Sequence, residues 1–270
     1  MAETTLPGTL RAWWILEKAS LRAQGQYRSN LFVGFLGGLT YQGIQVAFMA
    51  LLLAGFGVID GWGIDRIGLM VGIRLAAHAV YVMPFGSLLN TSQLVHDGEF
   101  DLLLLKPVNQ FTQIITRRFN ILTLGDALLG LAAVIAFAPQ APVDWTWWRL
   151  LYLLAAILGG GLVETSIQIA IASLAFRATV VNSLQTLADT VVTTFGIYPL
   201  SIFGPAGLIG LCFIFPLGLI AYLPAAALMN AAVPLPGWLV WASPAGGWIL
   251  FPAALALFTR MSRRYVSPGA

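Results

Sequence analysis

The stretch "LLYLLAAILGGGLVETSIQIAIASLA", residues 150–175, decides the class of fold. It carries one charged residue, Glu164, among leucine, isoleucine, alanine and glycine. A bilayer core about 30 Å thick is crossed by a helix of about 20 apolar residues. The stretch therefore predicts a transmembrane helix.

The composition extends this prediction to the whole chain of 270 residues. Hydrophobic residues make up 59% and charged residues only 9%, and the mean hydropathy is +0.84, whereas about a quarter of the residues in a soluble domain are charged. The apolar runs are continuous, without the polar and apolar alternation of a barrel strand. Because helices satisfy their backbone groups internally in lipid, we expect an all-α polytopic membrane protein.

We expect residues 1–270 to form one transmembrane domain. Its apolar runs predict six membrane spans. A further run, 206–229, is apolar but is broken by two prolines. The expected spans are 31–56, 67–89, 119–138, 150–175, 180–202 and 237–259.

Residues 8–28 precede the first span and have an amphipathic pattern. At 100° per residue, Trp14 and Leu21 share one face, and Lys18 and Arg22 share the neighbouring face. This pattern predicts a helix in the membrane interface. The alternative is a short soluble helix packed on another part of the protein.

Basic residues predict the orientation. Of the 14 lysines and arginines, only Arg66 and Arg149 fall in the loops of one side, and Arg74 lies within a span. Because cytoplasmic loops carry the excess of Lys and Arg, both termini and the 90–118 connection are expected in the cytoplasm.

This orientation allows only one of the segments 180–202 and 206–229 to cross the membrane. We favour 180–202 as the span and 206–229 as a re-entrant hairpin from the outer side, because prolines break helices where protein shelters the freed carbonyls. The reverse assignment stays open.

Motifs for catalysis are missing from the sequence. The two lysines, Lys18 and Lys106, do not follow the glycine of a phosphate-binding loop. The histidines His78 and His96 lie far apart, and Cys212 is the only cysteine. We therefore expect no catalytic residue, metal site or cofactor in this chain, and no nucleic-acid partner.

Five ionisable residues fall inside the expected spans. Such residues are costly in lipid and face a partner or a polar cavity. One interpretation is a pathway for a polar or cationic substrate. The other is structural: Arg74 or His78 pairs with Asp126 or Glu164, while Asp189 lies apart, near the cytoplasmic interface. The five residues are Arg74, His78, Asp126, Glu164 and Asp189.

The stretch "VHDGEFDLLLLKPVNQF", residues 95–111, concentrates charge directly after the second span. A short helix there would present Asp97, Glu99 and Asp101 to a basic cleft, while the leucines 102–105 anchor it on the bundle. Pro107 would end that helix, because the residue before proline is pushed out of helical geometry. The alternative is a solvated loop.

Two blocks resemble a known family. "HDGEFDLLLLKPVNQFTQIITRRF", residues 96–119, resembles the signature of bacterial ABC-2 type transporter permeases, and "YPLSIFGPAGLIGLCFIFPLGLIAYLPAAALM", residues 198–229, resembles that family's second, proline-rich block. In this chain Phe100 replaces a commoner isoleucine, and Gly204 stands before the expected proline.

The resemblance implies a coupling helix within 94–112 that docks onto a separately encoded ATPase, and a re-entrant segment over 206–229. The residues on its motif are Gly98, Asp101, Lys106, Pro107 and Phe111, and the charge of the stretch adds His96, Asp97 and Glu99 to the residues expected in coupling. Those of the re-entrant block are Pro199, Pro205, Pro216, Tyr222 and Pro224.

The resemblance further implies a permease subunit of an ATP-driven exporter in a bacterial cytoplasmic (inner) membrane. ATP and Mg would be bound by a dimer of cytosolic ABC ATPase subunits. The other partners would be membrane lipid and a second ABC-2 permease, forming a heterodimer or a homodimer. The motif does not give the cargo; if the buried acids line the pathway, we expect a small amphiphilic or cationic compound, such as a drug or toxin. The competing hypotheses are a motor-free secondary transporter and a membrane scaffold that recruits a cytosolic protein.

Overall fold

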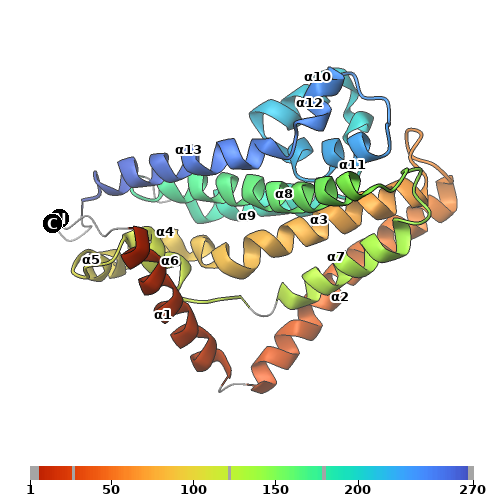
Figure 1. Cartoon of the computed structure of the whole chain (residues 1–270). Helices are drawn as coiled ribbons and strands as arrows, with labels where there is room; N and C mark the ends of the chain where they lie inside the picture. Colours follow the sequence, from red (N-terminus) through yellow and green to blue (C-terminus); the bar gives the residue numbers. More distant parts are fainter. Residues whose placement is uncertain (1–5, 26–27, 121–122, 178–180, 267–270) are drawn as a thin grey trace.

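Long helices lying side by side form the protein (Figure 1). The computed structural model describes residues 6–25, 28–120, 123–177 and 181–266. Within these ranges every regular secondary-structure element is a helix. The one isolated β-bridge joins Ile59 to Trp62 in a turn. The all-α class predicted from the sequence is confirmed.

The first half of the chain contains α1 (Leu6–Gly25), α2 (Arg28–Phe56), α3 (Ile64–Phe85), η1 (Gly86–Asn90), α4 (Thr91–His96), α5 (Glu99–Leu104), α6 (Gln110–Ile115) and α7 (Leu124–Phe137). The second half contains α8 (Trp147–Leu174), α9 (Val181–Phe195), η3 (Leu200–Phe203), α10 (Gly204–Ile209), η4 (Gly210–Ile214), η5 (Leu217–Leu219), α11 (Tyr222–Leu228), α12 (Gly237–Trp241) and α13 (Ala245–Ser262).

Helix α3 is the centre of the bundle. It packs on α7 and on α8, and α8 packs in turn along α13. Glycines allow the backbones to approach closely: a Cβ on Gly72 would lie 2.8 Å from the Val134 nitrogen of α7, and one on Gly159 would collide with the Pro244 carbonyl. Because these neighbours are backbone atoms, a larger residue at either position would force the helices apart.

The two ends of the bundle differ in structure. The short helices α4, α5 and α6 lie at one end, together with the C-terminal end of α13 and the start of α1, while α10, α11 and α12 lie at the opposite end (Figure 1). The segment predicted to be cytoplasmic thus shares one end of the bundle with the start of α1 and the C-terminal end of α13.

Three helical segments are long and apolar enough to cross a membrane: residues 31–56, 64–96 and 147–174. A fourth is obtained if α9 and the segment Leu200–Ile214, which meet at an angle of 111°, count as one broken span. Helix α7 is apolar but has only 14 residues. The six-span count therefore stays a prediction.

Two predicted spans have different bounds in the structure. The span predicted at 180–202 ends at Phe195, because the chain bends where Pro199 pushes Tyr198 out of helical geometry. The span predicted at 237–259 is divided into α12 and α13 at Ser243 and Pro244. Continuous hydropathy hides such breaks, since a bend can occur without any polar residue.

The proline-rich segment 206–229 folds into short turns of helix rather than one span. Pro199 precedes η3, Pro205 is the second residue of α10 and Pro216 precedes η5. Tyr222 and Pro224 lie in α11, which is completely buried and packs on α12, α3 and α8. This broken path is compatible with a re-entrant segment, which stays a prediction.

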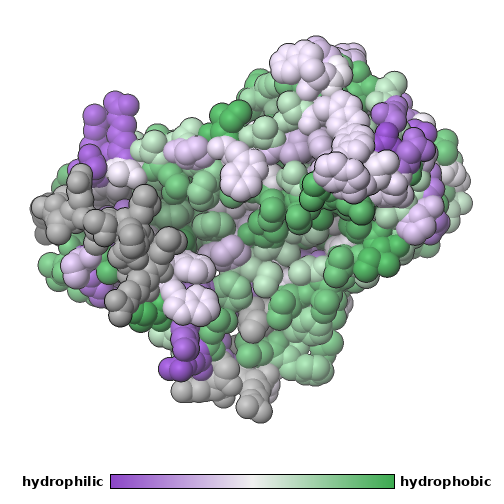
Figure 2. Space-filling model, viewed as in Figure 1, coloured by the Kyte–Doolittle hydropathy of each residue, from purple (hydrophilic) through white to green (hydrophobic). Residues whose placement is uncertain are grey.

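Apolar side chains cover much of the outer surface (Figure 2). On α2, for example, Phe32, Val33 and Leu51 are 63%, 66% and 72% exposed. Soluble monomers rarely expose contiguous apolar surface of this kind. The surface therefore fits a bundle surrounded by lipid.

Candidate functional site

The segment 94–112, predicted to couple the protein to an ATPase, contains a sharp turn at Gly98. Helix α4 ends at His96, and α5 starts at Glu99. Gly98 has a φ of +72°, and a Cβ at this position would contact nothing within 4 Å. Glycine is thus favoured by its backbone conformation and not by a lack of space.

Two side chains attach α5 to the bundle. Phe100 and Leu103 lie one turn apart and are 0% and 4% exposed. The Phe100 ring packs edge to face on Phe176, directly after α8, and on Tyr265, after α13, with centroids 4.9 Å apart in both pairs. Phe111 of α6 makes a similar contact with Phe258 of α13 at 5.4 Å. Aromatic contacts therefore connect the segment to α8 and α13.

The prediction that all four leucines 102–105 anchor this helix is wrong. Leu103 is buried, but Leu102, Leu104 and Leu105 are 60%, 45% and 82% exposed. The helical period explains the difference, because only residues three or four apart share a face. The exposed leucines form an apolar outer surface beside Glu99 and Asp101.

A buried glutamine holds the turn between α5 and α6 by two hydrogen bonds. Gln113 of α6 donates from Nε2 to the carbonyls of Leu103 at 2.9 Å and Val108 at 2.7 Å. The turn between these carbonyls holds Lys106 and Pro107, both exposed. The sequence analysis missed Gln113, although a glutamine followed by two isoleucines was a signal that a polar group is buried there.

Charged side chains at this end are partly paired. The Arg117 guanidinium donates to Glu99 at 2.9 Å, and His96 Nδ1 lies 3.1 Å from Asp97 Oδ1. Asp101 is half-buried. A cleft of about 290 Å³ opens beside these pairs, lined by Ser87, Asn90, Gln93, Leu94, Asp97, Glu99, Arg117 and Arg118. The surface thus combines both signs of charge, whereas the sequence analysis expected an acidic one.

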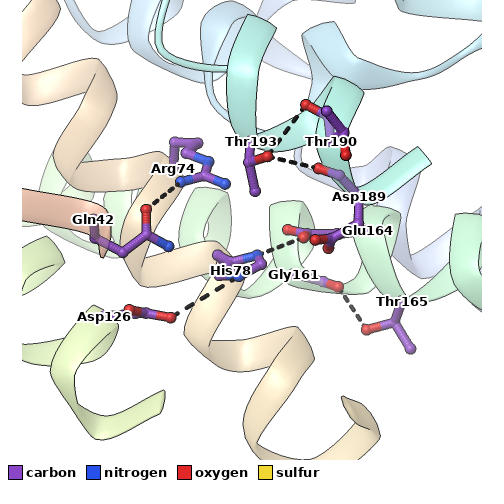
Figure 3. Close-up of polar contacts among 10 residues, drawn as sticks. All are labelled: Gln42, Arg74, His78, Asp126, Gly161, Glu164, Thr165, Asp189, Thr190 and Thr193. Carbon is purple, nitrogen blue, oxygen red and sulfur yellow. Dashed lines mark hydrogen bonds and ion pairs between the residues drawn. The ribbon is translucent and has the colours of Figure 1, made fainter. Parts of the chain in front are cut away.

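A second group of polar residues lies inside the bundle (Figure 3). His78 of α3 is its centre: Nδ1 lies 2.6 Å from Glu164 Oε1 of α8, and Nε2 lies 3.9 Å from Asp126 Oδ2 of α7. All three side chains are buried. The structure thus pairs His78 with both carboxylates, as the structural interpretation of the sequence predicted.

Arg74 lies one turn before His78 and is 0% exposed. Its Nη1 donates to Gln42 Oε1 of α2 at 3.3 Å, while Nε and Nη2 make no hydrogen bond to any described residue. Gln42 also interacts with Asp126. The sequence analysis missed Gln42, because one glutamine in an apolar run gives no indication of its partner.

Asp189 belongs to the same group, although the structural interpretation did not give it a partner; its predicted place near the cytoplasmic interface stays a prediction. Its carboxylate, that of Glu164 and a ring nitrogen of His78 all lie within 4.8 Å of one another. In Figure 3 the Asp189 and Glu164 side chains point toward each other from α9 and α8. The analysis could not foresee this contact, because it depends on how α9 packs against α8.

Comparison with known families identifies a match over most of the chain. The model of the family described as ABC-2 family transporter protein matches residues 39–269. Searches of curated proteins and of solved structures found no match. The family match covers most of the chain, including α3 to α13. The chain therefore belongs to the ABC-2 family of transporter proteins.

Proposed function

We propose that the chain is the permease subunit of an ATP-driven exporter and that α5, with the turn that follows it, docks onto a cytosolic ABC ATPase. Family membership supports transport, because ABC-2 permeases normally work with ATPase partners. The ATPase dimer would bind ATP and Mg. A second permease, different or identical, would complete the pathway, and a small amphiphilic or cationic compound would move outward.

One observation carries the docking proposal: α5 presents an apolar and charged surface on a rigid base. Leu102 and Leu105 are exposed beside the carboxylates of Glu99 and Asp101, while Phe100 is fully buried beneath them. Interfaces of this kind combine an apolar centre with a charged rim. Since Phe100 contacts residues that follow α8 and α13, movement of a docked ATPase would reach both long helices.

Co-purification tests the docking surface. The permease is expressed with an ABC ATPase from the same genome, and the variant Glu99→Ala with Asp101→Ala is compared with Leu105→Ala. Both should lower the recovery of the ATPase and the stimulation of ATP hydrolysis by the permease. Asp144→Ala is the matched control, because the Asp144 side chain is 95% exposed in the loop before α8.

Unchanged assembly and unchanged stimulation in both variants would contradict the docking assignment. If no partner ATPase assembles with the wild-type chain, the exporter proposal itself fails, and the secondary transporter or scaffold becomes the better hypothesis. Equal losses in Asp144→Ala would show that the effect is not specific to α5.

A further inference from the structure

Three potential metal ligands converge inside the bundle from three different helices. His78 lies on α3, Glu164 on α8 and Asp189 on α9, and one ligand atom from each lies within 4.8 Å of the other two. His78 and Glu164 are 7% and 1% exposed, and Asp189 is half-buried. Residues far apart in sequence thus form one compact donor set.

The charges of this region are unbalanced. Three carboxylates, those of Asp126, Glu164 and Asp189, interact with the guanidinium of Arg74. In the form that would bind a metal, with all three carboxylates ionised and a neutral imidazole at His78, the group has two more negative than positive charges. Buried charges in proteins are paired or coordinate metals, so one divalent cation would balance it.

Buried oxygen atoms without a hydrogen-bond partner also indicate a ligand beside His78, Glu164 and Asp189. Glu164 Oε1 contacts His78, but Oε2 is buried and has no hydrogen-bond partner among the described residues. The same holds for Gln168 Oε1, one turn later on α8, whose side chain is 1% exposed. A buried polar atom without a partner costs about 1–3 kcal/mol. A cation would satisfy the free Glu164 oxygen.

We propose that His78 Nδ1, Glu164 and Asp189 form a binding site for a divalent transition-metal ion. One imidazole nitrogen and two carboxylates suit zinc, manganese or iron. Ligand atoms sit about 2.0–2.2 Å from zinc, so the three groups need only small side-chain movements to surround an ion. Binding at Nδ1 requires a neutral imidazole with its one proton on Nε2, so a proton held between His78 Nδ1 and Glu164 without the ion either moves to Nε2 or, if His78 is an imidazolium, is released to solvent.

Asp126 supports the same assignment from the other side of the imidazole. A metal-bound histidine usually directs its second ring nitrogen to a carboxylate, which fixes the ring orientation. His78 Nε2 lies 3.9 Å from Asp126 Oδ2. The fourth and further positions around the ion remain for water or a substrate group.

Metal binding to the purified full-length chain tests the site. The protein is stripped with a chelator in detergent, and Zn²⁺ is titrated with the bound metal measured by mass spectrometry. Co²⁺ then serves as a spectroscopic probe of imidazole and carboxylate ligation. The wild type should bind one ion per chain, and Glu164→Gln and Asp189→Asn should each weaken binding at least about tenfold.

His96→Gln is the matched control, because His96 is the second of the two histidines and lies exposed beside Asp97. Its binding should equal that of the wild type. Absence of saturable binding in the wild type, unchanged binding in Glu164→Gln and Asp189→Asn, or its loss in His96→Gln would overturn the proposal. Size-exclusion chromatography identifies folded variants, and if Glu164→Gln is not folded the half-buried Asp189→Asn decides.

Discussion

Arg74 is a buried arginine with few hydrogen bonds to compensate for the loss of water around its charge. It is fully buried, and Gln42 is its one hydrogen-bond partner among the described residues. Its charge nevertheless offsets part of the negative charge of Asp126, Glu164 and Asp189. A guanidinium thus acts here through its field rather than through a close ion pair.

Replacing Arg74 should therefore destabilise the protein. Arg74→Met keeps most of the side-chain volume but leaves the carboxylates without their cation, and breaking a buried charge arrangement costs about 3–5 kcal/mol. Heating the protein in detergent and measuring the folded fraction by size-exclusion chromatography checks this.

Arg66→Met is the control, since Arg66 lies near the start of α3 and hydrogen-bonds only weakly to the Gly61 carbonyl at 3.5 Å. Its effect should stay within about 0.5 kcal/mol. Equal stability of the two variants would show that the charge of Arg74 is not needed inside the bundle.

Gly98 permits a second test at this scale. Gly98→Ala should cost about 1–2 kcal/mol at the turn between α4 and α5, because an alanine there must adopt a left-handed conformation. The expected result is reduced ATPase stimulation with an intact bundle. Gly37→Ala is the control: a Cβ on Gly37 also contacts nothing, but no positive φ is involved. Similar losses in both variants would exclude the backbone explanation.

Sequence spacing predicted part of the buried polar group. Arg74, His78 and Tyr81 recur on one face of α3 by helical periodicity alone, and all three are buried. The contact of Glu164 with Asp189 could not be predicted, because it depends on the packing of two helices. Periodicity identifies a face of a helix, but it does not identify the neighbour of that face.

Helix α1 shows how one element is fastened to the bundle. Ser20 Oγ accepts from the Phe119 backbone nitrogen at 3.2 Å, and Trp14 is 60% exposed on another face. Glu17 is 4% exposed, and neither of its carboxylate oxygens has a hydrogen-bond partner among the described residues. Burial raises the pKa of the Glu17 carboxyl above its usual value of 4.5.

This raised pKa predicts that docking of α1 depends on pH. A carboxyl whose pKa is raised in the docked state favours docking at low pH, and the stabilisation is lost as the pH rises through the raised value. Hydrogen exchange of α1 should therefore be faster at about pH 8 than at about pH 5, after correction for the intrinsic rate. Glu17→Gln should remove this difference. A pH dependence that persists in Glu17→Gln would assign it to another group.

The bounds of elements were predictable where polar residues interrupt apolar runs. The run 150–175 became α8, Trp147–Leu174, and 31–56 became α2, Arg28–Phe56. Breaks inside apolar runs were not, because the bend after Phe195 and the division at Pro244 occur between apolar segments. Proline position was the available signal, and it was stronger than hydropathy.

At the scale of the whole molecule, the two ends of the bundle should lie on opposite sides of the membrane. Cys212, the only cysteine, is 1% exposed, so the wild-type chain should react little with maleimides. Leu105→Cys and Trp238→Cys place a thiol at positions that are 82% and 72% exposed, one at each end.

In intact cells an impermeant maleimide should label Trp238→Cys but not Leu105→Cys, and both should react after permeabilisation. The wild type reports the background of Cys212. The opposite pattern would invert the orientation, and labelling of both variants in intact cells would contradict the predicted number of crossings.

Helix α8 connects the contact below α5 with the buried carboxylates, and its length sets the distance between them. Helix α8 ends at Leu174, which stands 10 residues beyond Glu164 and two before Phe176, the residue that supports Phe100. Since a helix rises about 1.5 Å per residue, this part of α8 spans about 15 Å between the base of α5 and the buried carboxylates. A small tilt imposed at the C-terminal end of α8 would shift Glu164 relative to Asp189 on α9. Movement of α5 would thus be transmitted to the buried carboxylates.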